Sequence, residues 1–143
     1  MLSKIAAAAT VALVVSPVYA NPNNTNISDN YSIKGNLSLI TSSGLGSDSE
    51  CKGYRGYSDI YGGQQILIKD GKGEVIAVGS LGTGVRDAQY PNIACNLSIV
   101  VNNIPDSDFY QIVLGSGRRG SLTYSKQELQ EKKWSVDVLL TDD

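Results

Sequence analysis

The segment 51–62, "CKGYRGYSDIYG", carries the densest group of side chains in the sequence that could bind a ligand. Its three tyrosines, Tyr54, Tyr57 and Tyr61, have amphipathic rings that can stack on a sugar or contact a protein. The same rings can instead seat the loop on a core while their hydroxyls stay hydrated or hydrogen-bonded. We expect packing to be their main role, so that the exposed remainder of the loop forms any binding surface.

A second candidate is the segment "GSGRRG" at 115–120, which matches the glycine pattern of dinucleotide-binding proteins. That pattern works inside a βαβαβ unit with an acidic residue at the end of a later strand, whereas Asp137 falls within a predicted strand. We therefore interpret the segment as a glycine-rich turn between strands. Its adjacent Arg118 and Arg119 could bind an anion together with backbone N–H groups of the turn, or could be solvated surface charges.

Three carboxylates could support other chemistry. Acids such as Asp59, Asp70 and Glu74 can hydrolyse a substrate without histidine, and their oxygens could hold calcium. Asp70 and Glu74 stand in "DGKGE", however, where the spacing fits a hairpin turn better than the alternating ligands of a calcium loop. We therefore predict no metal site, and we expect Asp59 to accept hydrogen bonds from loop N–H groups.

The composition excludes several classes of function. The chain of 143 residues has no histidine, which removes catalytic triads built on that residue and the commonest metal ligand. Its two cysteines, Cys51 and Cys95, form no C-x-x-C pair of the kind that binds zinc. We expect no catalytic residues, no cofactor and no enzymatic activity, with a carboxylate-based hydrolase as the remaining enzymatic alternative.

The N-terminus has the features of a signal peptide over residues 1–20. Lys4 precedes a short apolar run, and Ala20 offers a small residue for cleavage ahead of Asn21. The run is shorter than the roughly 20 residues that a membrane-spanning helix needs, although an uncleaved anchor is the alternative. We therefore expect a secreted or periplasmic protein with no membrane span.

We expect the exported chain to consist of a flexible leader and one domain. Residues 21–30, "NPNNTNISDN", are polar, whereas 31–143 has the length of a single domain. The 12 basic residues of the chain, less Lys4, leave 11 against 14 acidic ones, which argues against a nucleic-acid or membrane-surface partner. An envelope or extracellular protein or a glycan is the expected partner, and we expect a monomer.

The two cysteines predict a disulfide between Cys51 and Cys95, because compartments outside the cytoplasm are oxidising. Closing a loop of this length restricts the unfolded chain by about 4 kcal/mol. Two separate buried thiols, or a bond to another molecule, are the alternatives.

The periodicity of apolar residues predicts about seven strands. Alternation begins in "YSIKGNLSLIT", with an interruption expected at Gly35, and "QQILIKDGKGEVIAVGSLG" predicts a hairpin that turns at 70–73. The later strands are "ACNLSIVVNNI", "DFYQIVLG", "SLTY" and "WSVDVLL". This pattern favours a mainly-β, two-sheet antiparallel sandwich, transthyretin-like or immunoglobulin-like, because a parallel sheet would need several crossover helices.

One short helix is predicted near the C-terminus, over 126–133. Ser125 stands at the N-cap position and Glu128 follows three residues later, which is the spacing of a capping box. Lys132 and Lys133 suit the negative end of the helix dipole.

The order of these segments resembles a known family. "ILIKDGKGEVIAVGSLGTG" followed by "CNLSIVVNNIPDSDFYQIVLG" is similar to the transthyretin-like β-sandwich modules of carboxypeptidase regulatory domains and bacterial surface proteins. The longer span from "CKGYRGYSDI" to "YSKQELQEKKW" resembles small exported bacterial domains of unknown function. The resemblance implies a sandwich fold and an exported bacterial protein, and it implies no mechanism.

These features predict an exported, non-enzymatic module that binds a partner or supports an envelope or extracellular assembly. The alternative is a small-ligand or glycan binder that uses loop 51–62.

The exported protein is expected to begin at Asn21 and to contain one intramolecular disulfide. Intact mass spectrometry of the exported protein measures both properties, because signal cleavage and oxidation each change the mass by a known amount. A mass that still includes residues 1–20, or two thiols that alkylate without reduction, would contradict the prediction.

Overall fold

The computed structural model of the chain describes residues 30–142. The predicted signal peptide and positions 21–29 of the predicted leader lie outside the described residues. In chain order the elements are β1 (Tyr31–Ile40), the 3₁₀-helix η4 (Arg55–Tyr57), β2 (Gln65–Lys69), β3 (Val75–Leu81), β4 (Val85–Arg86), β5 (Ala94–Ile104), β6 (Phe109–Leu114), β7 (Ser121–Ser125), α2 (Lys126–Glu131) and β8 (Ser135–Thr141).

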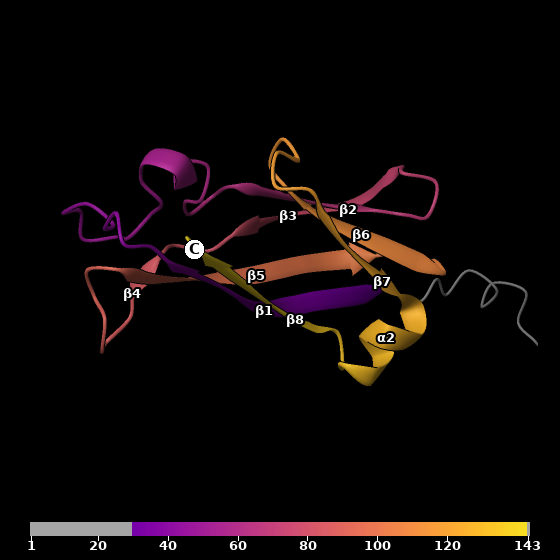
Figure 1. The fold of residues 1–143 in the computed structure, drawn as a ribbon. Coiled ribbons are helices and arrows are strands. Elements are labelled where there is room, and N and C mark those ends of the chain that lie inside the picture. The colour runs from indigo at the N-terminus through magenta and orange to yellow at the C-terminus, as the bar shows by residue number, and fades with distance from the viewer. Residues whose placement is uncertain (1–29, 143) are drawn as a thin grey trace, which may run out of the picture.

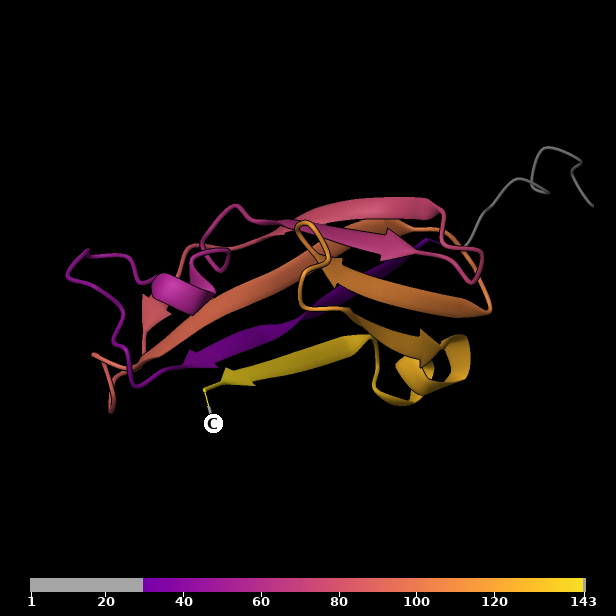
Figure 2. The same cartoon turned by 45° about the horizontal axis from the view of Figure 1, so that its top comes forward.

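All eight strands belong to one sheet, in the order β7-β6-β2-β3-β5-β1-β8, with the short β4 beside β5. Neighbouring strands are antiparallel except β1 and β8, which are parallel. Figures 1 and 2 show that this sheet curls strongly, like half of a barrel. The predicted mainly-β fold with a short C-terminal helix is confirmed, but one curled, mixed sheet stands in place of the predicted two-sheet antiparallel sandwich.

The core lies on the concave face of the curled sheet. In β5, Leu97, Ile99 and Val101 are buried at every second position, and Ile66 and Ile68 of β2 follow the same alternation. Curling brings these inner faces together, so the sheet packs against itself instead of against a second sheet. The alternation of apolar residues identifies the buried face of each strand. It is the same in a two-sheet sandwich and in a single curled sheet, so it could not distinguish the two folds.

The β2–β3 hairpin turns at the predicted residues. The Asp70 N–H donates to the Glu74 carbonyl oxygen over 2.9 Å. The Asp70 carboxylate in turn accepts from the N–H groups of Lys72 and Glu74 at 2.9 and 3.0 Å. Gly73 has a φ of +84°, a conformation that glycine adopts without steric cost. Asp70 therefore stabilises the turn through its side chain.

The parallel pair of β1 and β8 depends on Gly35. The strand continues through Gly35, where an interruption was predicted, and the residue pairs with Val136. A Cβ atom at this position would overlap the carbonyl oxygen of Val136. Glycine therefore permits the close approach of the C-terminal strand. The register of β1 shifts instead between Tyr31 and Ile33.

The helix α2 begins with the predicted capping box. The Ser125 hydroxyl accepts from the Glu128 N–H at 3.1 Å, and the Glu128 carboxylate accepts from the Ser125 N–H at 3.3 Å. The helix ends earlier than predicted, because Lys133 and Trp134 adopt left-handed φ angles of 55° and 59°. The Trp134 ring stacks on Tyr31 with 4.2 Å between the ring centroids, which holds this turn against the core.

The edge strands β7 and β8 border a small apolar cavity of about 90 Å³, lined in part by Leu122, Val138 and Leu140. Among the described residues, no ladder joins β7 to β8. The curled sheet therefore remains open between its two edges.

Gly35→Ala is expected to lower the free energy of unfolding by about 2 kcal/mol, because the added methyl group must push β8 away from β1. Gly56→Ala is the matched control, since no atom lies within 4 Å of a Cβ at that position. The control should change stability by less than about 0.5 kcal/mol. Urea unfolding of both variants measures the difference, and equal stability of Gly35→Ala and the wild type would contradict the close β1–β8 pairing.

Candidate functional site

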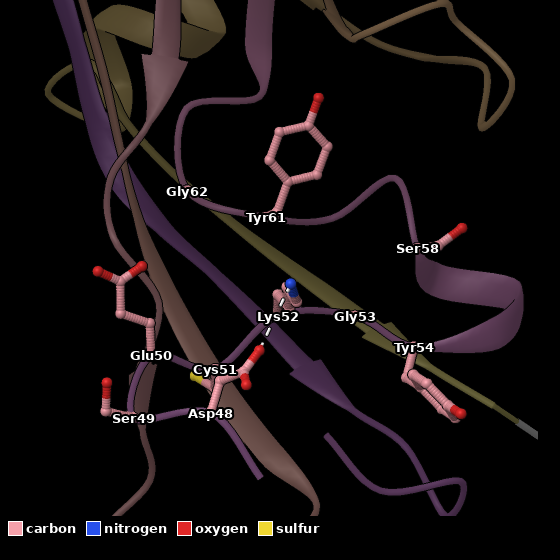
Figure 3. A pocket seen from close by; sticks show the side chains of 10 residues that line it. All are labelled: Asp48, Ser49, Glu50, Cys51, Lys52, Gly53, Tyr54, Ser58, Tyr61 and Gly62. Carbon is pink, nitrogen blue, oxygen red and sulfur yellow. Dashed lines mark ion pairs between the residues drawn. The ribbon is translucent and has the colours of Figure 1, made fainter. Parts of the chain in front are cut away.

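An open cleft of about 770 Å³ lies between two parts of the segment that follows β1. Figure 3 shows residues 48–54 on one side and Ser58, Tyr61 and Gly62 on the other. We call this site, defined by these ten residues, the tyrosine cleft. It combines aromatic, charged and hydroxyl side chains with glycine backbone.

The predicted Cys51–Cys95 disulfide is confirmed, and it anchors the tyrosine cleft to β5. The two Cα atoms are 5.8 Å apart and both side chains are buried. The Cys51 N–H also donates to the Gly84 carbonyl oxygen at 3.3 Å, and a Cβ at Gly84 would overlap the Cys51 carbonyl oxygen. The disulfide is consistent with an oxidising location outside the cytoplasm.

Arg119 belongs to the glycine-rich turn between β6 and β7, and its side chain binds the η4 side of the cleft. Its guanidinium donates two hydrogen bonds to the Asp59 carboxylate, at 2.8 and 2.6 Å, and a third to the Gly56 carbonyl oxygen at 2.7 Å. The same group lies 4.8 Å from the centroid of the Tyr57 ring. Arg119 therefore connects two segments that are distant in sequence, and we call this set of contacts the Arg119 clasp.

The contacts of the Arg119 clasp favour the ionised form of Asp59 and the protonated form of Arg119. The hydrogen bonds from Arg119 lower the pKa of Asp59, although partial burial opposes this shift. The same carboxylate raises the pKa of Arg119. Both side chains are about one-fifth exposed, so solvent screens the pair less than it would screen a surface ion pair. Asp59, a possible acid for catalysis in the sequence, is thus bound as an ionised structural group.

Arg86 of β4 fixes the opposite side of the cleft, and sequence reasoning missed it. Its guanidinium donates to the carbonyl oxygens of Gly46 and Asp48 at 3.0 and 2.7 Å, and to that of Pro91 at 2.7 Å. All three acceptors are backbone atoms, so no residue type in the sequence signals the interaction. The segment that leads into the cleft is thereby attached to the sheet.

The three tyrosines lie in different environments. Tyr57 is partly buried and packs against the core beneath Arg119. Tyr54 and Tyr61 line the cleft and are 52% and 41% exposed. Of the two arginines in the turn, Arg119 is engaged in the clasp, whereas Arg118 is an exposed side chain that does not line the cleft. Of the five sequence-predicted residues, two therefore line the cleft, two hold the loop in place, and Arg118 does neither.

The polar groups of the cleft are accessible. The Lys52 ammonium lies 3.5 Å from the Asp48 carboxylate, and both side chains are more than half exposed. Such a pair contributes at most about 1 kcal/mol, so a ligand can displace it at small cost. Within residues 30–142, the exposed Glu50 side chain takes part in no ion pair. Ser58 adds a hydroxyl on the other side of the cleft.

The structure does not bring the three candidate carboxylates together. Asp59 is bound in the Arg119 clasp before β2, whereas Asp70 and Glu74 belong to the hairpin turn after β2. The strand β2 separates the two positions, as the ribbon in Figure 1 shows. Paired action of Asp59 with either of the other acids therefore has no geometric basis.

Comparisons of the chain with protein-family models, curated proteins and solved structures find no match. In the part of the chain that the structure describes, no helix has the length and apolar character needed to cross a membrane. The domain is therefore classified by its own features, as a mainly-β, disulfide-bonded domain built on one curled, mixed sheet.

Asp59→Asn is expected to lower the free energy of unfolding by about 2 kcal/mol at neutral pH, because the charge-assisted bonds from Arg119 are lost. Since folding lowers the pKa of Asp59, its contribution is complete above the ordinary value of 3.8 and is lost as the pH falls through the lower folded value. The stability difference between wild type and variant should therefore be constant well above pH 3.8 and should shrink as the pH falls below that value.

Urea unfolding at a series of pH values measures this difference. Asp108→Asn is the matched control, because Asp108 is exposed and forms no ion pair within the described residues. A stability difference for Asp59→Asn that persists unchanged at low pH would show that the Arg119 clasp is not the cause.

Proposed function

We propose that this protein is an exported, non-enzymatic binding module that recognises an envelope or extracellular partner through the tyrosine cleft. The observation that carries the proposal is the pair of exposed rings, Tyr54 and Tyr61, on a loop whose other contacts are fixed by the fold. The disulfide, the predicted signal peptide and the resemblance to small exported bacterial domains support a secreted or periplasmic location.

Preorganisation of the loop supports a binding role. The disulfide, Arg119 and Arg86 attach the cleft to β5, to the β6–β7 turn and to β4, respectively. A loop that is already ordered loses less conformational entropy when a partner binds. Tyrosines suit such a surface because they offer large amphipathic rings with few torsions to immobilise.

A carboxylate-based hydrolase has less support from the same geometry. The Asp59 carboxylate is engaged by Arg119, and Asp70 accepts two backbone hydrogen bonds in its turn. Both acids therefore have structural partners, and they lie at opposite ends of β2. A binding role needs only the exposed tyrosines, whereas hydrolysis also needs a pair of acids near the substrate, which Asp59 and Asp70 do not form.

The double variant Tyr54→Ser/Tyr61→Ser is expected to reduce recovery of the natural partner at least tenfold, because both exposed rings of the cleft are removed. Affinity capture from the native extracellular fraction, with the mature chain as bait, measures the recovery. Tyr90→Ser is the matched control, since Tyr90 is 54% exposed and does not line the cleft.

The melting temperature of each variant should stay close to that of the wild type, because the substituted rings are largely exposed. Equal recovery by the wild type and the double variant would overturn the proposal. A loss of recovery with Tyr90→Ser alone would place the contact surface elsewhere on the domain.

A further inference from the structure

We infer that the ligand of the tyrosine cleft is a neutral oligosaccharide. This inference rests on the proposed function and names the chemical class that the same site binds. The cleft combines three features that a sugar chain requires: exposed aromatic rings, hydrogen-bonding groups of both kinds, and little net charge.

The aromatic rings provide the apolar contacts. A pyranose has a face of C–H groups that packs on the π face of an aromatic ring, whereas its hydroxyls point outward. Tyr54 and Tyr61 lie on different parts of the cleft wall, and in Figure 3 their rings point in opposite directions, Tyr61 upward and Tyr54 downward. The Arg55 guanidinium lies over the Tyr54 ring at 5.7 Å from its centroid and supports it, while half of the side chain stays exposed. Two separated rings suit a chain of sugar units better than a single one.

The polar groups match the hydroxyls of a sugar, which both donate and accept hydrogen bonds. The carboxylates of Asp48 and Glu50 accept, the ammonium of Lys52 donates, and the Ser58 hydroxyl can do either. Bonds to charged groups are stronger than bonds between neutral groups, so a few of them can orient a neutral ligand. The exposed ion pair between Lys52 and Asp48 is weak, so both groups can separate and form hydrogen bonds with sugar hydroxyls instead.

The charges of the cleft disfavour acidic ligands. Two carboxylates against one ammonium repel an acidic sugar such as a uronic acid. The Lys52 ammonium lies 3.5 Å from the Asp48 carboxylate and offsets part of the negative charge of the two acids. A neutral ligand therefore meets a smaller electrostatic penalty than an acidic one.

The size and shape of the cleft also fit an oligosaccharide. Its volume of about 770 Å³ lies within the range of roughly 300–1,000 Å³ of small-ligand sites, and it is partly open to solvent. A protein interface of ordinary size needs about 800 Å² on each partner around an apolar centre. In this cleft the apolar groups are two separated tyrosines and a buried disulfide, which is a smaller apolar surface than such a centre requires.

Isothermal titration calorimetry of the mature protein tests the inference with four hexasaccharides. Three are neutral, built from glucose, mannose or N-acetylglucosamine, and the fourth is built from galacturonic acid. We expect at least one neutral hexasaccharide to bind, and the acidic one to bind at least tenfold more weakly. Tyr54→Ser and Tyr61→Ser should each weaken neutral binding at least tenfold, and Glu50→Gln about fivefold. Tyr90→Ser should leave it unchanged.

Binding of no neutral hexasaccharide, stronger binding of the acidic one, or insensitivity to both tyrosine substitutions would overturn the inference. If the captured partner is an unglycosylated protein and its recovery depends on Tyr54 and Tyr61, the oligosaccharide inference fails while the proposed binding function stands. If recovery is independent of both tyrosines and no hexasaccharide binds, the proposed function and the inference fail together.

Discussion

The Cys51–Cys95 bond is the constraint on which the architecture of the site depends. It ties the long segment between β1 and β2, which has no regular structure except η4, to the beginning of β5. Because β5 pairs with β1, β3 and β4, the covalent bond reaches the middle of the sheet and not an edge. Without it, the segment would keep much of the conformational entropy of an unfolded chain. Arg119 and Arg86 then fix the two sides of the cleft through backbone oxygens that the disulfide holds within reach.

Features that depend on neighbouring residues could be predicted from the sequence. The capping box of α2 and the β2–β3 turn each involve residues three or four positions apart, and both form as expected. The Asp59–Arg119 pair could not be predicted, because it joins residues 60 positions apart that carry no shared local pattern. The single sheet was also missed. The parallel strands β1 and β8 are the first and last of the domain, so all the intervening elements serve as their connection and no crossover helix is needed.

In the candidate site, the sequence also could not predict the role of each single side chain. Tyr54 and Tyr57 are three residues apart and chemically identical, yet one lines the cleft and the other packs beneath Arg119. The sequence singled out this loop as the best candidate for binding, and the structure places an open cleft along it. It could not assign a role to each ring, because the assignment depends on where the β6–β7 turn places one guanidinium. Packing is thus the role of Tyr57, whereas the exposed Tyr54 and Tyr61 are the rings to which we assign the proposed recognition.

The parallel pairing of β1 and β8 has a mechanical consequence. Tyr31 and Thr141 lie at opposite ends of this pair, since β1 begins near Ser135 and Ile40 pairs with Thr141. A force that pulls these two residues apart acts along both strands in opposite directions, so it loads the backbone hydrogen bonds between Lys34 and Ile40 in shear, all at once. Strands that are loaded in this way must break their bonds together, whereas strands peeled from one end lose them singly. A domain attached at both ends to larger structures would therefore resist tension along the axis of these two strands.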